Sequence, residues 1–79
     1  PKFDPDYVQI STSEAAEILG LSFETLHKFR TTDENFPDGY RDRSNWLAPI
    51  RYRLSDIYRY SEYMMMEGKS ISEEPEPPG

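Results

Sequence analysis

Residues 10–30 of this chain read ISTSEAAEILGLSFETLHKFR, and this stretch decides the fold. Ser11 and Glu14 have the spacing of a capping box, in which the serine hydroxyl accepts a hydrogen bond from the glutamate N–H and the glutamate carboxylate reaches back to the serine N–H. The apolar residues between positions 15 and 19 recur with the period of a helix that buries one face. Gly20 is predicted to end this helix, because glycine adopts the left-handed conformation that a helix stop often requires.

A second helix is predicted directly after this turn, over residues 22–30. Ser22 is a favourable N-cap, and Leu21 in front of it is placed to pack on Leu26. Leu26 and Phe29 fall on one side of this helix, where they can be buried. Two short helices joined by a turn that contains glycine are typical of a helix-turn-helix.

Turn-forming residues occupy positions 31–39, and a more regular segment follows them. Residues 40–53 alternate loosely between apolar and polar side chains, which predicts a β-hairpin with its tip at residues 43–45 or 48–49. We expect Trp46 and the tyrosines after residue 39 to pack in the core and against this hairpin rather than to stack on bases.

A third helix is predicted to begin at residues 54–56. Ile57, Tyr60 and Met64 form its apolar stripe, and Gly68 is its expected end. Of the three consecutive methionines at positions 64, 65 and 66, at least one is expected in the core, and the others suggest a partner surface.

The chain therefore divides into one domain with short flanking segments. Residues 1–7 contain two prolines and predict a non-helical arm, and residues 8–10 predict a short strand or an extended lead-in. The folded domain spans residues 8–68 and is mainly α-helical with a small β-hairpin, an α+β class. Residues 69–79 are rich in proline and glutamate and predict a disordered acidic tail.

Composition excludes several classes of function. The 79 residues include no cysteine and a single histidine, so neither a thiolate metal site nor a multi-histidine site is expected. No apolar run approaches the ~20 residues that span a bilayer. No catalytic constellation and no phosphate-binding glycine loop appear. We expect a cytoplasmic protein that is not an enzyme, needs no cofactor and senses no small-molecule effector.

The charge of the chain is unevenly distributed. The net charge is −6, whereas proteins that bind nucleic acid are usually basic. The excess of acidic residues lies at the two ends, and residues 23–53 carry six lysines and arginines against five acidic residues. The fold can gather these cations on one face, so the net charge alone does not exclude DNA as a partner.

The segments ISTSEAAEILGLSFETLHKFR, FPDGYR and IRYRLSDIYRY together resemble a known family. They look like the winged helix-turn-helix DNA-binding proteins of phages and bacteria that include excisionase, AlpA-like and MerR-like proteins. The residues that carry the resemblance are Ser11, Thr12, Glu14, Ala15, Ala16, Leu19, Gly20, Ser22, Thr25, Leu26, Pro37, Arg53, Ser55 and Asp56. The acidic loop at 31–40 and the enlarged wing at 44–50 depart from the family pattern.

The resemblance implies that the helix at 22–30 enters the major groove of DNA. It also implies that a hairpin wing at 40–53 lies on the adjacent backbone or minor groove. The residues expected to contact DNA are Ser22, Thr25, His27, Lys28, Arg30, Arg41, Arg43, Asn45, Arg51 and Arg53. Phosphate contacts are expected to dominate the affinity and to make it depend steeply on salt.

Several of these residues also have a purely structural interpretation. Ser22 can serve only as a cap, and Thr25 can be an ordinary surface residue. His27 is favoured as a surface residue. Arg51 and Arg53 can pair with nearby carboxylates instead of phosphates, the candidates being Asp38, Asp42 and Asp56.

The sequence therefore predicts a sequence-specific binder of double-stranded DNA. It would act as an excisionase-like recombination directionality factor, with a recombinase as a protein partner, or as a transcriptional regulator. The alternative is a winged-helix module for protein interaction or a phage DNA-packaging component like a terminase small subunit. The acidic net charge and the exposed methionines favour this alternative. An acidic mimic of DNA is the least favoured, because the acids are interleaved with arginines.

Overall fold

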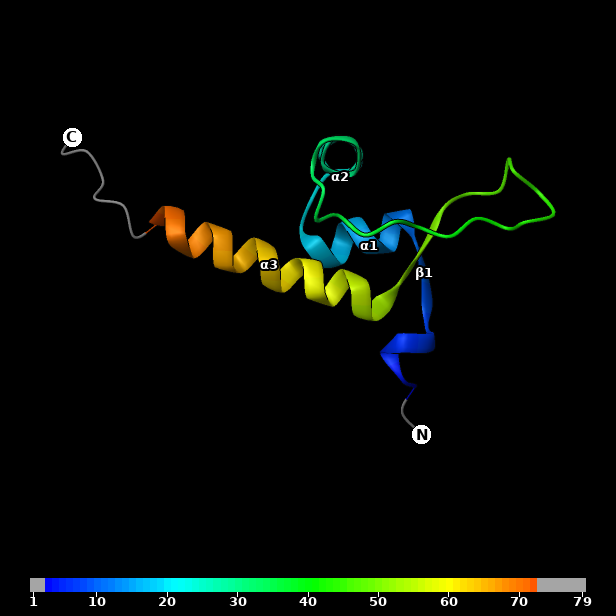
Figure 1. Ribbon diagram of the computed structural model, residues 1–79, viewed down its shortest axis with the longest axis horizontal. Helices are drawn as coiled ribbons and strands as arrows, with labels where there is room; N and C mark the ends of the chain where they lie inside the picture. Colours follow the sequence, from blue (N-terminus) through cyan, green and yellow to red (C-terminus); the bar gives the residue numbers. More distant parts are fainter. Residues whose placement is uncertain (1–2, 73–79) are drawn as a thin grey trace.

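The computed structural model describes residues 3–72 as three α-helices, one turn of 3-10 helix and a two-stranded antiparallel sheet. Along the chain these elements are η1 (Pro5–Tyr7), β1 (Gln9–Ser11), α1 (Thr12–Leu19), α2 (Phe23–Thr32), β2 (Arg51–Arg53) and α3 (Leu54–Ser72) (Figure 1). The predicted α+β class is confirmed.

The caps predicted for the first two helices are present. The Ser11 hydroxyl accepts a hydrogen bond from the Glu14 N–H at 3.0 Å, and the Glu14 carboxylate accepts one from the Ser11 N–H at 2.9 Å. Gly20 ends α1 with a φ of 68° in the left-handed region. Ser22 caps α2, which continues two residues past the predicted end, to Thr32. The local sequence therefore fixes where α1 stops and where α2 starts.

The sheet differs from the predicted hairpin. Strand β2 pairs with β1 in the register Gln9 to Arg53, Ile10 to Tyr52 and Ser11 to Arg51. On its other edge, β2 makes only an isolated bridge with Tyr40, and residues 41–50 form a loop of turns. The hairpin predicted over 40–53 is therefore confirmed only as the single antiparallel pair Tyr40–Arg51, and its predicted strands are otherwise absent. Turn-forming side chains in this loop bond to the local backbone instead of aligning it with β2.

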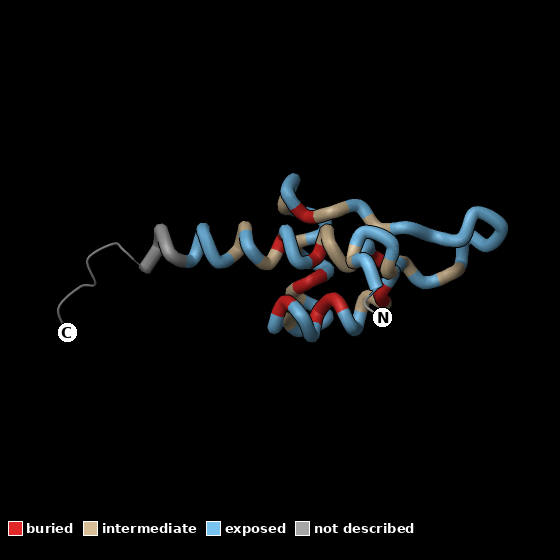
Figure 2. Tube along the Cα trace, turned by 90° about the horizontal axis from the view of Figure 1, so that it is seen from below, coloured by how far each residue is buried: buried red, intermediate tan, exposed pale blue. Residues whose placement is uncertain are grey.

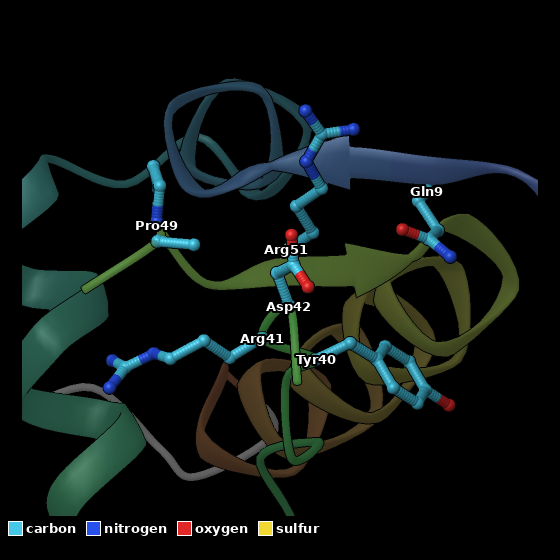
Figure 3. A pocket seen from close by; sticks show the side chains of 7 residues that line it. Gln9, Tyr40, Arg41, Asp42, Pro49 and Arg51 are labelled. Carbon is cyan, nitrogen blue, oxygen red and sulfur yellow. The ribbon is translucent and has the colours of Figure 1, made fainter. Parts of the chain in front are cut away.

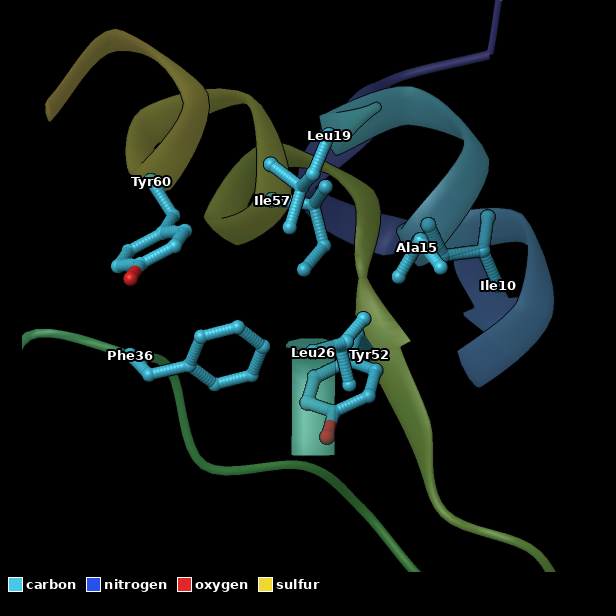
Figure 4. Close-up of a cluster of buried hydrophobic side chains, with 9 residues drawn as sticks. Ile10, Ala15, Leu19, Leu26, Phe36, Tyr52, Ile57 and Tyr60 are labelled. Carbon is cyan, nitrogen blue, oxygen red and sulfur yellow. The ribbon is translucent and has the colours of Figure 1, made fainter. Parts of the chain in front are cut away.

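The core lies where the two short helices, the sheet and the first half of α3 meet, while the loop and the far end of α3 are exposed (Figure 2). Its buried side chains are Ile10, Ala15, Ala16, Leu19, Leu26, Phe36, Tyr52, Ile57 and Tyr60 (Figure 4). The Phe36 ring packs edge-on against Tyr60 and Tyr52, with centroid distances of 4.8 Å and 5.7 Å. This cluster holds α2 in a fixed orientation relative to the sheet.

Helix α3 is longer than predicted. It runs through Gly68 to Ser72, so the expected stop at Gly68 is wrong. A glycine inside a helix destabilises the helix by only about 1 kcal/mol relative to alanine, so the helix can continue through it. The tail predicted at 69–79 therefore begins in helix, and residues 73–79 lie outside the described part of the chain. The distal half of α3 projects away from the rest of the domain (Figure 1).

The methionines of α3 follow the predicted pattern. Met64 packs against the core with Ile57 and Tyr60, whereas Met65 and Met66 are exposed. Within residues 3–72, no helix combines the length and the apolar character that crossing a membrane requires.

The N-terminal segment contains a helical turn that was not predicted. Pro5–Tyr7 form η1, and the Asp4 carboxylate caps it by accepting a hydrogen bond from the Asp6 N–H at 2.9 Å. Proline is favourable at the start of a helix because its φ is already helical and no N–H is needed there. The non-helical arm over residues 1–7 is therefore corrected to a short turn, and residues 1 and 2 lie outside the described part.

Candidate nucleic-acid interface

Helix α2 buries one side and leaves the other uncovered. Leu26 is fully buried, and Phe29 packs against the same core, as predicted. The opposite side carries exposed side chains, namely Glu24, His27, Lys28 and Thr31. This division follows from the helical period, in which residues three and four apart share a face. The uncovered side of α2 is free to contact another macromolecule.

Ser22 and Thr25, both predicted to contact DNA, bond to each other at the start of α2. The Ser22 hydroxyl accepts a hydrogen bond from the Thr25 N–H at 3.1 Å and donates one to the Thr25 hydroxyl at 2.8 Å. Ser22 is exposed and Thr25 is half-buried. The capping role of Ser22 is confirmed, and a DNA contact from either residue stays a prediction.

A groove of about 300 Å³ runs between α2, the start of α1 and the base of the 41–50 loop. Phe23, His27 and Arg30 line one wall, since they follow one another at helical spacing. Pro49 and Ile50 line the other wall. The groove brings the predicted residues His27 and Arg30 next to the loop.

The loop base is anchored to α1 by a hydrogen bond. The Thr12 hydroxyl donates to the carbonyl of Ile50 at 2.8 Å, over a separation of 38 residues. This contact fixes one end of the loop beside α2.

Phe23 is a candidate that the sequence interpretation missed. Its side chain is 60% exposed at the first turn of α2, on the wall of the groove. Its helical position, one turn before His27 and away from Leu26, is the signal that could have revealed it.

The two arginines of β2 lie on the outer face of the sheet. Arg51 and Arg53 are exposed, and Tyr52 between them points into the core because side chains alternate along a strand. The Arg53 guanidinium lies 5.8 Å from the centroid of the Tyr40 ring, a cation–π contact. Arg51 makes a small contribution to the lowered pKa of Glu14, whose main cause is the hydrogen bond from the Ser11 backbone.

The carboxylate pairing considered for these arginines is absent. In the part of the chain that the structure describes, the ion pair found is the one between Arg59 and Asp56, at 3.1 Å within α3. Asp56 therefore forms its ion pair within α3, and the side chains of Arg51 and Arg53 remain exposed. The pairing interpretation is wrong for residues 3–72.

Loop residues 41–50 are held by local hydrogen bonds. The Asp42 carboxylate accepts from both the N–H and the hydroxyl of Ser44, at 2.9 Å and 2.7 Å, and these bonds lower the pKa of Asp42. The Asn45 side-chain oxygen accepts from the Leu47 N–H at 3.1 Å. The Arg41 guanidinium donates to the Trp46 carbonyl at 2.9 Å. Arg41 and Asn45 thus shape the loop in addition to any role at an interface.

The tip of this loop carries Trp46 and Leu47, with 75% and 72% of their side chains exposed. The expectation that Trp46 packs in the core or against a hairpin is therefore wrong. Successive tight turns carry the indole away from the body of the domain, where no strand is present to receive it.

A second hollow, of about 410 Å³, lies on the sheet side of the loop base (Figure 3). Tyr40 and Arg41, at the start of the loop, line one wall of this hollow, and their side chains point in opposite directions. Arg51 lines it from β2. Pro49 lines both this hollow and the groove beside α2. The predicted residues therefore form two groups on either side of the loop base, His27 with Arg30 and Arg41 with Arg51, whereas Lys28, Arg43 and Arg53 lie outside both hollows.

The described residues hold no group of three histidine, cysteine or acidic side chains that could bind a metal ion. Comparison with known protein families, with curated proteins and with solved structures finds no match to this chain.

Proposed function

We propose that this protein binds double-stranded DNA in a sequence-specific manner as a small winged-helix protein. In this proposal α2 enters the major groove, which is wide enough for a helix and displays a different pattern of donors and acceptors for each base pair. The observation that carries the proposal is the uncovered side of α2, joined by a shared groove to the base of the loop that carries Arg41 and Arg43.

The charges of this region support the proposal. The six cations of the central segment are all exposed, and none of them takes part in the ion pair found among the described residues: Lys28, Arg30, Arg41, Arg43, Arg51 and Arg53. Exposed cations gain most from a polyanion, because each phosphate that they neutralise releases bound counterions. Glu24 lies on the uncovered side of α2, where a carboxylate can accept a hydrogen bond from the amino group of cytosine.

The biological role that we propose is a recombination directionality factor or a transcriptional regulator. Both roles require a small reader of one DNA site, which a domain with the uncovered side of α2 can provide. A recombinase is the protein partner proposed for the first role.

An unbiased selection of bound duplexes, followed by affinity measurements on the selected sequence, tests the proposal. Lys28→Ala should weaken binding several-fold, because it removes a cation from the face that meets DNA. Arg59→Ala is the matched control, since it removes an equal charge from α3, where Arg59 pairs with Asp56. Absence of any enriched duplex, or equal losses for both variants, would contradict the proposal.

A protein-interaction module, including a DNA-packaging component, is the second candidate. The observation in its favour is the exposed apolar surface of α3, formed by Tyr58, Met65 and Met66. Exposed apolar clusters mark protein interfaces more often than DNA interfaces. Sedimentation of the purified chain with and without duplex separates the candidates, because this module would form a protein assembly whose mass does not depend on DNA.

A further inference from the structure

The loop over residues 41–50 presents two large apolar side chains to solvent at its tip. Trp46 and Leu47 are adjacent in the chain and more than 70% exposed, and Trp46 is the only tryptophan in the sequence. The loop extends from the domain on the side opposite the projecting end of α3 (Figure 1). Side chains of this kind at a protruding tip have no packing role within their own domain.

The tip is ordered by its own hydrogen bonds. The Arg41 guanidinium closes the loop on the Trp46 carbonyl at 2.9 Å, and the Ala48 N–H donates to the Asn45 carbonyl at 2.9 Å. The Asn45 side chain also holds the Leu47 N–H. The two apolar side chains are therefore presented in a defined conformation, so that little further order has to be imposed when they insert into a partner.

The charged residues near the tip indicate which kind of partner it would bind. The loop itself carries two arginines, Arg41 and Arg43, and its one acidic residue, Asp42, accepts hydrogen bonds from Ser44; two further arginines follow the loop on β2. An apolar tip flanked by cations suits a polyanion that has an apolar interior. The stacked bases of duplex DNA meet this description.

The position of the loop base points to the same partner. Pro49 and Ile50 share a groove with Phe23, His27 and Arg30 of α2. A duplex that received α2 in its major groove would therefore pass its backbone close to the loop, and the tip would reach the neighbouring minor groove.

We propose that Trp46 and Leu47 form an apolar wedge that enters the minor groove, partly unstacks one base step and bends the duplex. This inference rests on the proposed DNA-binding function. Apolar side chains that insert in this way kink DNA toward the major groove. The wedge predicts a preference for pyrimidine–purine steps, which unstack most easily, at positions that α2 does not contact.

Tryptophan fluorescence tests the insertion directly in the full chain, because Trp46 is the single tryptophan. The probe is a duplex selected from a random-sequence library. Binding should quench or blue-shift the Trp46 emission and protect it from acrylamide. If the duplex binds while the emission and the acrylamide quenching stay unchanged, the wedge is overturned and the DNA-binding function stands. If no duplex is enriched, both fail.

Bending of the same duplex, followed by energy transfer between dyes at its two ends, gives a second measurement. The Trp46→Ala/Leu47→Ala variant should straighten the bound duplex and bind about tenfold more weakly, whereas Trp46→Phe should keep most of the bend. Met65→Ala/Met66→Ala, which removes two other exposed apolar side chains from α3, should change neither quantity. Because all four residues are exposed, the variants should fold normally, which circular dichroism checks.

Replacing guanine by inosine identifies the groove, because it removes the amino group from the minor groove and leaves the major-groove edge unchanged. This replacement at the wedge step should strengthen binding of the wild-type chain several-fold and leave the wedge variant unaffected. Equal responses of the two chains would overturn insertion into the minor groove. A blue shift of Trp46 with phosphatidylserine vesicles but not with the bound duplex would instead assign the tip to a membrane surface.

Discussion

At the scale of single residues, Asp33 ties the end of α2 to α3. Its carboxylate accepts hydrogen bonds from the Tyr60 hydroxyl at 2.7 Å and from the Asn35 N–H at 2.9 Å. The Tyr60 bond is the main reason that the pKa of Asp33 lies below its ordinary value of 3.8. Burial is the main cause that raises the pKa of Tyr60, and the bond to Asp33 adds to it. The pair holds the end of α2 against α3.

We expect the Asp33–Tyr60 bond to make the domain sensitive to acid. A carboxylate with a lowered folded pKa stabilises the fold fully above its unfolded value, and this stability is lost as the pH falls through the folded pKa. The free energy of unfolding should therefore fall as the pH drops from about 5 to about 2. Asp33→Asn and Tyr60→Phe should both flatten this dependence in urea titrations. A slope equal to that of the wild type in both variants would contradict the assignment.

At the scale of elements, the junction between the loop and β2 depends on close approach of the backbone. Tyr40 exchanges backbone hydrogen bonds with Arg51, at 2.6 Å and 2.8 Å. Gly39 precedes this bridge, and a Cβ there would overlap the Ile50 Cγ2 atom and lie 3.0 Å from the Arg51 carbonyl oxygen. A Cβ added at Gly68 in α3 would meet no neighbouring atom. One glycine is therefore required by packing and the other is not.

Alanine substitutions at these two glycines should have opposite effects. Gly39→Ala should lower the free energy of unfolding by about 1–3 kcal/mol, because the added methyl group forces Ile50 or the bridge to move. Gly68→Ala should raise it by about 0.5–1 kcal/mol, because alanine favours the helix and meets no neighbour. Urea unfolding followed by circular dichroism measures both. A neutral Gly39→Ala variant would show that the loop base is not held closely.

At the scale of the whole molecule, an elongated shape separates two kinds of surface. The domain measures 55 × 32 × 19 Å, with the 41–50 loop at one end and the distal half of α3 at the other (Figure 1). A chain with a net charge of −6 can still present exposed cations on both sides of the loop base, because its acidic excess lies at the two ends of the sequence. We expect attraction to DNA to be local and strongly screened by salt.

The salt dependence of DNA affinity should therefore show whether the arginines of β2 contact phosphates. If Arg51 and Arg53 each contact one phosphate, Arg51→Gln and Arg53→Gln should each reduce the slope of log affinity against log salt concentration by about 0.9. Titrations of a labelled duplex at several salt concentrations measure this slope. Arg59→Gln, on the paired arginine of α3, should leave it unchanged. Retention of the full slope in the β2 variants would remove these arginines from the interface.

The sequence by itself determined both ends of α1 and the start of α2, because these are set by neighbouring residues, whereas the ends of α2 and α3 lie beyond the predicted positions. Ser11 with Glu14, Gly20 and Ser22 act over at most three positions, so the capping box and the turn between α1 and α2 could be predicted. The buried positions of α2 and α3 followed from the helical period in the same way. The exposed side of α2, and with it the candidate site, was therefore within reach of sequence reasoning.

Only the tertiary structure decided the partner of β2 and the direction of the loop. Pairing of β2 with β1 depends on contacts between residues some 40 positions apart, which no local pattern encodes, and on its other edge β2 pairs only with Tyr40. Tryptophan is a large apolar residue of the kind that usually packs in a core. Trp46 is nevertheless exposed, because residues 41–50 form no strand and the indole has nothing to pack against. The wedge proposed at its tip is for this reason a feature that the fold, and not the sequence pattern, brought to the surface.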